Sequence, residues 1–265
     1  MDILGFLASI IIGVSLGLIG AGGSILTVPM LVYLFSVDAA VATVYSLFVV
    51  GVTSVAGSFS YIKNGKVNLS TAIFFGIPSV MAVFFTRKFI VPAIPQNIIT
   101  IGNFTLSKNA LLMLIFAGLM LWASYKMIKK CTHCNESETQ PQGFNIKLVL
   151  FQGILVGFVT GLIGAGGGFL IIPALVNMLK LPMKTAVGTS LVIIAFNSLS
   201  GFAFSLEHFD IAWPLLIKVT MVAIVGIWIG SFLSTKIDGK KLKPAFGWLV
   251  LLMGFYIICK EVFIS

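Results

Sequence analysis

Two glycine-rich phrases are the residues of this chain whose types and spacing most clearly suggest chemistry. "GLIGAGGSILTVPMLV" covers residues 17–32, and "GLIGAGGGFLIIPALV" covers residues 161–176, 144 positions later. Glycine reaches backbone angles that other residues avoid, so each phrase predicts a break between two helices. The amide N–H groups that begin the next helix would form an anion site made of backbone. The same phrase also fits a tight turn between two packed helices.

Hydroxyl and amide side chains follow both phrases at equivalent positions. They are Thr43, Ser46, Thr53 and Ser54 after the first phrase, and Thr189, Ser190, Asn197 and Ser198 after the second. Ser46 and Ser54 are eight residues apart, as are Ser190 and Ser198, so each pair lies on roughly one face of a helix. Such side chains can line a polar path, or they can bond back to their own helix or to a neighbouring one.

The composition indicates that these residues lie in a membrane protein. The chain has 265 residues, of which 58% are hydrophobic and 9% are charged, whereas a soluble domain has roughly 25% charged residues. Apolar runs have about the length of a membrane-spanning helix; they cover residues 67–85, 110–125, 211–233 and 246–259. The fold class that follows is an all-α integral membrane protein in a lipid bilayer. The N-terminus resembles a first span rather than a cleaved signal.

The chain divides into two similar halves at a polar linker. At the offset of 144 residues, Pro29 matches Pro173 and Ser54 matches Ser198. We expect a first membrane repeat over residues 1–130, a linker over 131–145 and a second membrane repeat over 146–265. Each repeat would contain a glycine-broken helix hairpin followed by three transmembrane helices. Residues 98–107 alternate around a Gly-Asn pair and predict a small external β-hairpin.

The second leg of each hairpin is too short to cross a bilayer. Residues 24–35 and 168–179 have 12 residues each, which is about 18 Å of helix against a hydrocarbon core of about 30 Å. Short, glycine-interrupted segments at matching positions of two halves indicate the substrate site of a transporter. The sequence leaves open whether the hairpins are re-entrant or fully spanning.

The basic residues, which give a net charge of +9, predict the orientation. If the second leg returns the chain to its starting side, twelve lysines share one face. They are Lys63, Lys66, Lys126, Lys129, Lys130, Lys147, Lys180, Lys184, Lys236, Lys240, Lys241 and Lys243. Only Arg87, Lys88, Lys108 and Lys260 lie on the other face. If the second leg stays on the far side, the same sixteen basic residues divide seven against nine between the two faces, which shows no bias. The first arrangement places the linker in the cytoplasm and both termini outside, with the two halves inverted.

The remaining ionisable residues favour some mechanisms over others. Lys218 is the one ionisable residue well inside an expected span; it could attract substrate or extend toward the surface. Every carboxylate falls in a tail, a connection or a helix end, which disfavours proton coupling through a buried Asp or Glu. Backbone and hydroxyl oxygens could still hold sodium. Cys131, His133 and Cys134 form a lone C-x-x-C cluster that we interpret as a reduced, solvated linker rather than a metal site.

These residues resemble a known family. The phrase "GLIGAGGS…P" followed by "AVATVYS", and "GLIGAGGG…P" followed by "TAVGTS", are similar to the TauE/SafE sulfite-exporter family over essentially the whole chain. The resemblance implies transport of sulfite, thiosulfate, a sulfonate or another small organosulfur anion. It also implies that the transport site is framed by Gly20, Gly22, Gly23 and Pro29 together with Gly164, Gly166, Gly167 and Pro173. Tyr45 departs from the internal repeat, since Thr189 takes its place in the second half.

We therefore expect a secondary transporter of a small anion in the cytoplasmic membrane, working by alternating access without a cofactor or a metal. The candidate substrate-binding residues are Gly20, Gly22, Gly23, Ser24, Ser46, Ser54, Gly164, Gly166, Gly167, Gly168, Ser190, Asn197, Ser198 and Lys218. The alternative is a carrier of a non-sulfur anion or a metabolite. A membrane-embedded enzyme would need a catalytic constellation, and both histidines, His133 and His208, lie outside the spans. A sensor or scaffold is a further alternative, no nucleic-acid partner is expected, and a homodimer stays open.

Overall fold

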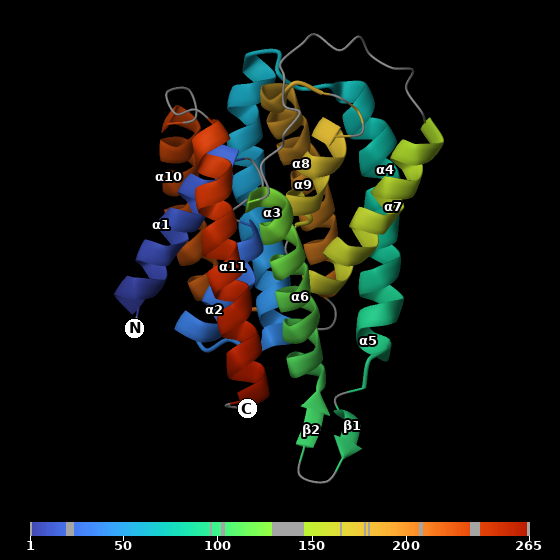
Figure 1. Ribbon diagram of the computed structural model, residues 1–265, viewed down its shortest axis with the longest axis vertical. Helices are drawn as coiled ribbons and strands as arrows, with labels where there is room; N and C mark the ends of the chain where they lie inside the picture. Colours follow the sequence, from blue (N-terminus) through green and yellow to red (C-terminus); the bar gives the residue numbers. More distant parts are fainter. Residues whose placement is uncertain are drawn as a thin grey trace.

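A computed structural model describes residues 2–19, 24–95, 97–101, 104–128, 146–164, 166–177, 179, 181–206, 209–233 and 239–263. It is a helical bundle with one small β-hairpin (Figure 1). The first elements are α1 (Asp2–Ile19), α2 (Ser24–Leu34), α3 (Ala39–Lys63), α4 (Leu69–Phe85), the π-helical turn η1 (Thr86–Ile90), α5 (Val91–Ala93), β1 (Asn97–Ile101), β2 (Phe104–Ser107) and α6 (Lys108–Ile128). They are followed by α7 (Ile146–Ile163), α8 (Gly168–Asn177), α9 (Met183–Ser205), α10 (Trp213–Leu233) and α11 (Gly239–Phe263).

The helix lengths confirm part of the pattern expected from the sequence. Among the described residues, four helical runs are long and apolar enough to span a membrane: α3, residues Leu69–Ala93, residues Lys184–Ser205 within α9, and α10. The second legs are short, with 11 residues in α2 and 10 in α8, or about 17 and 15 Å of helix. The β-hairpin is also present, with Ile99 opposite Leu106 and Thr100 opposite Thr105.

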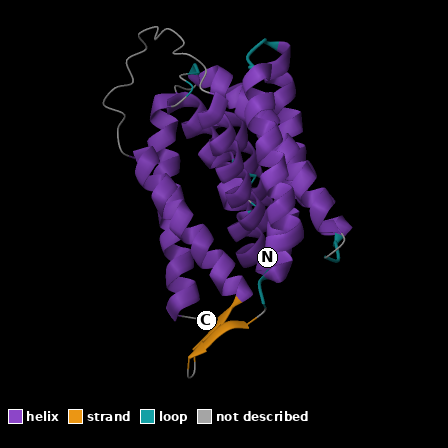
Figure 2. Cartoon of the chain, turned by 90° about the vertical axis from the view of Figure 1, so that its right-hand side faces the viewer, coloured by secondary structure: helices purple, strands orange, loops and turns teal. Residues whose placement is uncertain are grey.

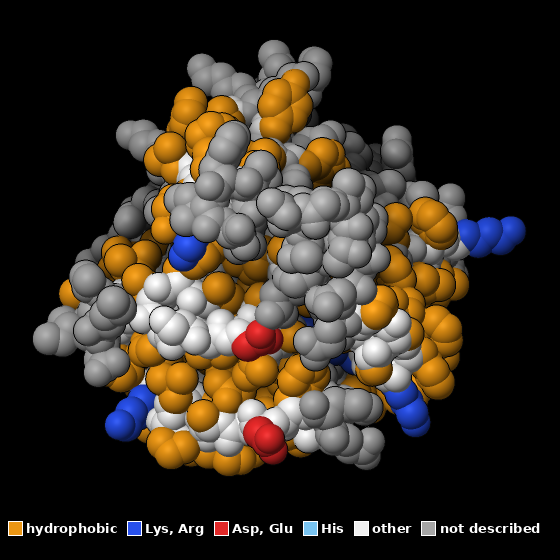
Figure 3. Space-filling model, turned by 90° about the horizontal axis from the view of Figure 1, so that it is seen from below, with side chains coloured by type: hydrophobic (Ala, Val, Ile, Leu, Met, Phe, Trp, Pro, Cys, Tyr) orange, Lys and Arg blue, Asp and Glu red, His pale blue; other side chains and the backbone are white. Residues whose placement is uncertain are grey.

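The bundle is apolar outside and partly polar inside. Phe59, Met81, Phe151 and Trp228 all expose more than half of their surface, and hydrophobic side chains dominate the end view in Figure 3. Many serine and threonine side chains are buried instead, among them Ser46, Ser54, Thr160 and Ser198. A protein surrounded by lipid tails needs this distribution, because lipid cannot satisfy polar groups and neighbouring helices can.

Glycines let the outer helices lie backbone to backbone. α1 packs along α10, and α7 packs along α4. A Cβ on Gly13 would overlap the carbonyl oxygen of Ala223, and one on Gly157 would overlap that of Ser79. Gly13 and Gly157 are equivalent at the offset of 144 residues, as are Ala223 and Ser79. The two helix pairs therefore use the same contact.

The central pair, α3 and α9, is antiparallel. Gly57 in α3 faces Leu191 in α9, while Gly201 in α9 faces Leu47 in α3. A residue near the C-terminal end of each helix thus contacts a residue nearer the N-terminal end of the other, as in an antiparallel pair. α6 packs against α11 beside this pair.

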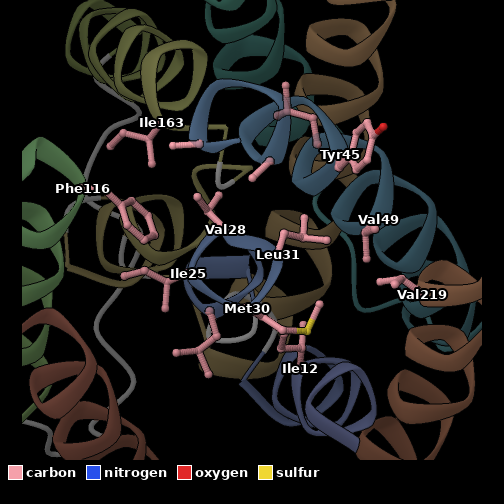
Figure 4. Close-up of a cluster of buried hydrophobic side chains, with 14 of the residues drawn as sticks. Ile12, Ile25, Val28, Met30, Leu31, Tyr45, Val49, Phe116, Ile163 and Val219 are labelled. Atoms are coloured by element: carbon pink, nitrogen blue, oxygen red, sulfur yellow. The ribbon is translucent and has the colours of Figure 1, made fainter. Parts of the chain in front are cut away.

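The short helix α2 lies inside the bundle. Its residues Ser24 to Leu31 are all buried. Figure 4 shows Ile25, Val28 and Leu31 surrounded by side chains from other helices, including Phe116, Ile163 and Val219. Because α2 cannot reach across the membrane, these neighbours supply the apolar contacts on all its sides.

Local signals in the sequence set the ends of the central helices. α3 ends at an Asn64–Gly65 turn in which Gly65 has φ of +65°. The side chain of Asn68 then accepts the N–H of Thr71 at 2.9 Å and caps α4. The backbone N–H of Asn68 donates to Thr189 Oγ1 at 2.9 Å, joining this turn to α9. The turn lies at the end of the bundle opposite the β-hairpin (Figures 1 and 2).

The glycine contacts yield a stability prediction. Gly157→Ala should lower the free energy of unfolding by about 1–3 kcal/mol, because the new Cβ meets the Ser79 carbonyl in a packed interface. Gly118→Ala is the matched control, since nothing lies within 4 Å of its Cβ position. The control should be unchanged, or stabilised by about 1 kcal/mol through helix propensity. Thermal unfolding in detergent, followed by tryptophan fluorescence, measures both. Equal stability of the two variants would contradict the packing argument.

Candidate functional site

The second glycine phrase forms a buried turn between α7 and α8. Gly164, Gly166 and Gly167 have φ of +73°, +67° and +68°, a region that side-chain-bearing residues rarely adopt. The N–H of Gly164 donates to the carbonyl of Thr160 at 2.8 Å and closes α7. The carbonyl of Gly167 accepts the N–H groups of Leu170 at 3.0 Å and Ile171 at 3.1 Å, which starts α8. The C-terminal end of α7 therefore lies next to the N-terminal end of α8.

Three other helical segments, α3, η1 and α9, contact this turn closely. A Cβ on Gly164 would lie 2.6 Å from Thr43 Cβ and 2.7 Å from Arg87 Nη2. A Cβ on Gly166 would lie 2.7 Å from Val50 Cγ1 and 2.8 Å from Ser198 Oγ. No side chain larger than hydrogen fits at either glycine, so neighbouring groups reach the backbone of the turn itself.

Arg87 corrects the sequence analysis. The expected span ended at residue 85, and Arg87 was assigned to a connection on the outer face. The helix instead continues through η1 and α5, with the N–H of Val91 bonded to the carbonyl of Thr86. Arg87 exposes only 3% of its surface. The prediction that Lys218 is the one ionisable residue within a span is therefore wrong. The sequence did not reveal this, because an Arg-Lys pair gives no sign of a π turn and usually marks a helix end.

The guanidinium of Arg87 has one hydrogen bond within the described part of the chain. Its Nη1 donates to Thr43 Oγ1 at 3.1 Å, and Thr43 Oγ1 donates in turn to the carbonyl of Ala40 at 2.7 Å. Nε and Nη2 have no partner among the described residues. Two N–H donors of a buried cation are thus unpaired beside the glycine turn.

Several of the expected hydroxyls are buried without a hydrogen bond to described residues. These groups are Ser46 Oγ, Ser54 Oγ and Ser198 Oγ, and Thr160 Oγ1, which the sequence analysis did not single out, is buried in the same way. Of these, Ser198 faces Gly166 and Thr160 faces Gly167. Ser190 differs, because its hydroxyl donates to the carbonyl of Val187 in its own helix at 2.8 Å. For Ser190, the alternative of bonding back to its own helix applies.

Asn197 and Ser79 join α9 to α4. Asn197 Nδ2 donates to Ser79 Oγ at 2.6 Å, and Asn197 Oδ1 has no partner among the described residues. Both side chains are buried. The amide therefore bridges two helices and still presents an unused acceptor.

The candidate residues are not all brought together. Gly164, Gly166, Gly167 and Ser198 are neighbours. Gly168 begins α8 and Ser24 begins α2, and both are buried. Gly20, Gly22 and Gly23 lie outside the described residues, as do Cys131, His133 and Cys134.

Two further side chains stand apart from the turn. Lys218 is exposed on α10 and does not join the group. The hydroxyl of Tyr45 accepts the N–H of Ala212 at 2.5 Å, so this residue links α3 to the segment before α10. This hydrogen bond gives a structural reason for the departure of Tyr45 from the internal repeat.

The internal repeat does not reproduce the charged side chain of Arg87. At the offset of 144 residues, Ser231 takes the place of Arg87 and Val187 takes the place of Thr43. Thr160 and Ser79 correspond to Leu16 and Ala223. The backbone contacts of the two halves are alike, and Ser54 matches Ser198, but Arg87, Thr43 and Thr160 around the second glycine turn have no counterparts of the same type in the other half.

The hydrogen bond between Ser79 and Asn197 can be measured by a double-mutant cycle. Ser79→Ala, Asn197→Ala and the double variant should show a coupling energy of about 0.6 kcal/mol, the average for side-chain hydrogen bonds between membrane helices. Ser205→Ala serves as the control partner, because its hydroxyl bonds only the carbonyl of Gly201 at 2.8 Å on the same helix. Unfolding in detergent supplies the free energies. Zero coupling between Ser79 and Asn197 would contradict the bridge.

Comparisons with known proteins agree with this architecture. A probable membrane transporter protein of Xylella fastidiosa (strain Temecula1) is 27% identical over 255 residues, covering 95% of this chain and 92% of the relative. The probable membrane transporter protein YunE of Bacillus subtilis is 25% identical and covered over its whole length. A probable membrane transporter protein of Methanocaldococcus jannaschii is 28% identical over 94% of this chain and 92% of the relative.

No solved structure matches the chain. The family model described as "Sulfite exporter TauE/SafE" matches residues 5–257. This range contains both glycine phrases, Arg87 and the helices that surround the buried turn. The chain belongs to the TauE/SafE sulfite exporter family of membrane transporters.

Proposed function

We propose that this protein is a secondary transporter that carries a small anion, a sulfur oxyanion or a sulfonate, across the cytoplasmic membrane by alternating access. The observation that carries the proposal is the buried glycine turn at Gly164–Gly167. The N-terminal end of α8, the unpartnered hydroxyl of Ser198 and that of Thr160 gather around it. Membership of the sulfite exporter family favours a sulfur anion as the substrate.

The chemistry of the turn suits a negative charge. The N-terminus of a helix carries partial positive charge and unpaired N–H groups, which makes it a ready anion site. Because the glycines have no side chains, a bound oxygen can approach these N–H groups directly. The hydroxyl of Ser198 can donate a further hydrogen bond. By the same reasoning the first phrase, with Gly20, Gly22, Gly23 and Ser24, forms the corresponding part of the site.

The two halves form inverted repeats in this proposal. Support comes from α3 and α9, which are equivalent in sequence and antiparallel in the bundle. Further support comes from the reciprocal packing of α1 on α10 and α7 on α4. Inverted repeats provide two similar, oppositely directed bundles, and rocking one against the other can expose a central site to each side in turn.

The proposed orientation has the linker in the cytoplasm and both termini outside. The excess of lysines on the linker side supports it. In Figure 1 the N and C labels lie toward the end of the bundle that carries the β-hairpin, away from the turn after α3. An even number of crossings would produce this arrangement.

The first test is counterflow in proteoliposomes. Purified protein is loaded with unlabelled sulfite, thiosulfate or a sulfonate, and uptake of the sulfur-labelled species is compared with uptake by protein-free liposomes. We expect exchange above background for at least one sulfur anion. Exchange of only non-sulfur anions or metabolites would favour the alternative substrate class. No exchange of any solute by folded protein would reject the transporter proposal.

The glycine turn is tested by Gly166→Ala. Transport should fall by roughly tenfold or more, a factor that corresponds to about 1.4 kcal/mol, because the new Cβ meets Val50 and Ser198. Gly65→Ala is the matched control: its φ of +65° imposes the same backbone strain, but nothing lies within 4 Å of the Cβ position. The control should transport at close to the wild-type rate. Equal loss in both variants would attribute the effect to strain rather than to the site.

Orientation is tested by cysteine labelling in intact cells. The three native cysteines are replaced, and a single cysteine is introduced at the exposed residue Asn64 or Asp210. A membrane-impermeant maleimide should label Asp210→Cys from outside and Asn64→Cys only after the cells are opened. The reverse pattern would invert the proposed topology.

A further inference from the structure

A buried cation with unpaired donors lies beside the glycine turn. Arg87 is 3% exposed, and within the described residues its only hydrogen bond is to Thr43. Burying a charged side chain costs several kcal/mol unless it is paired with an opposite charge and hydrogen-bonded. Two carboxylates with described side chains, Asp38 and Asp210, are both exposed. Within the described part of the chain, the site therefore contains a positive charge without an ion-pair partner, where an anion would be stabilised.

The unpaired nitrogens of Arg87 lie on the same edge of its guanidinium group. In a guanidinium group, the N–H bonds of Nε and Nη2 are nearly parallel and lie along one edge. The bond to Thr43 uses Nη1, so this edge is intact, and neither of its nitrogens has a described partner. Such a fork matches two oxygens attached to one atom, as in a carboxylate, a sulfonate or sulfite. A monatomic anion can use only part of it.

The Nη2 group of Arg87 lies against the backbone of the turn. This nitrogen lies 2.7 Å from the point where a Cβ on Gly164 would be. The N-terminal end of α8, which favours negative charge, begins four residues later at Gly168. The guanidinium and the helix end therefore act on the same region of the bundle.

We propose that Arg87 binds the negative charge of the transported substrate, with Nε and Nη2 as a bidentate ligand for two oxygens on one atom, and that Thr43 positions the guanidinium. This inference rests on the proposed transport function and narrows its substrate class to oxyanions with an O–X–O edge. The charge comes from one half alone, since Ser231 and Val187 take the equivalent places in the other.

A purely structural role is the competing explanation. Arg87 also lies next to the C-terminal end of α7, whose partial negative charge favours a nearby cation. In that case, neutralising Arg87 would destabilise the protein and leave the anion concentration for half-maximal transport unchanged. The two roles therefore differ in their effect on the half-saturating anion concentration, which rises only if Arg87 binds the anion.

The test measures binding and transport in the same variants. Binding is the rise in melting temperature of detergent-solubilised protein with sulfite or methanesulfonate, with chloride as the monatomic comparison. Wild-type protein should be stabilised more by the oxyanions than by chloride. Arg87→Gln should abolish the difference and raise the half-saturating concentration for counterflow by roughly tenfold to a hundredfold, as expected for the loss of a charge-assisted hydrogen-bonded pair. For Arg87→Lys, the half-saturating concentration should lie between those of wild-type protein and Arg87→Gln, because an ammonium group keeps the charge but cannot form two parallel hydrogen bonds.

Two further variants keep the proposal testable if Arg87→Gln does not fold. Thr43→Val, which copies the residue of the second half, should raise the half-saturating concentration with the maximal rate retained, and Thr43→Ser should restore it. Lys88→Gln is the matched control, because Lys88 is the next residue, is exposed and lies 5.3 Å from the ring centroid of Phe84. It should leave both binding and transport unchanged.

The outcomes separate this inference from the proposed function. If wild-type protein exchanges sulfur anions, and Arg87→Gln and Arg87→Lys do so with unchanged half-saturation, transport stands and the role of Arg87 is overturned. If wild-type protein binds oxyanions through Arg87 but exchanges nothing, the binding site stands and transport is overturned. Equal stabilisation of wild-type protein by chloride and by oxyanions would reject the bidentate fork.

Discussion

A break in a helix at membrane depth has to be enclosed by protein, and the arrangement of this bundle follows from that requirement. Lipid cannot hydrogen bond to the backbone groups that a glycine turn leaves unpaired. α2 and α8 are too short to reach both surfaces, so their ends lie within the bundle. Close packing of α7 on α4 then keeps lipid away from the described turn between α7 and α8. The small residues Gly13 and Gly157 matter because they let whole backbones approach.

Within this enclosure the two halves share a backbone plan and differ in side-chain chemistry. Equivalent glycines meet equivalent carbonyls, as Gly13 and Gly157 show. The polar groups are unequal: Thr43 and Arg87 in the first half approach the turn of the second half, and no similar pair exists at the equivalent positions. In the proposed transporter, a repeated framework would provide the two directions of movement, while an asymmetric set of side chains would define one binding position.

Much of the fold could be predicted because it depends on an internal repeat and on long apolar runs separated by short polar segments. The offset of 144 residues and the apolar runs predicted the helices and the short second legs, and the alternation around the Gly-Asn pair within residues 98–107 predicted the β-hairpin. The glycines at 164, 166 and 167 could be assigned to a turn since glycine adopts those backbone angles far more readily than other residues. In each case the signal was local, or it was present twice.

The contacts of the site could be predicted only in part. The position of Arg87 depends on a π turn, and its sequence, Thr-Arg-Lys-Phe-Ile, contains a charged pair that is typical of a helix end. Ser190 and Ser198 have the same residue type and lie on the same face, yet one bonds to its own helix and the other faces Gly166. Only the packing of neighbouring helices distinguishes them. Pairing across the bundle, as between Ser79 and Asn197, has no signature along the chain.

The π turn at Thr86–Ile90 also affects how relatives are to be aligned with this chain. A π turn holds one residue more than the α-helical turn it replaces. A relative with one residue fewer between Val83 and Pro92 would rotate every later side chain by about 100°. Such a relative would present a different residue to the glycine turn, even where an arginine occupies the aligned column. The length of the segment between Val83 and Pro92, together with the residue aligned with Arg87, therefore decides which homologues place a guanidinium inside the bundle.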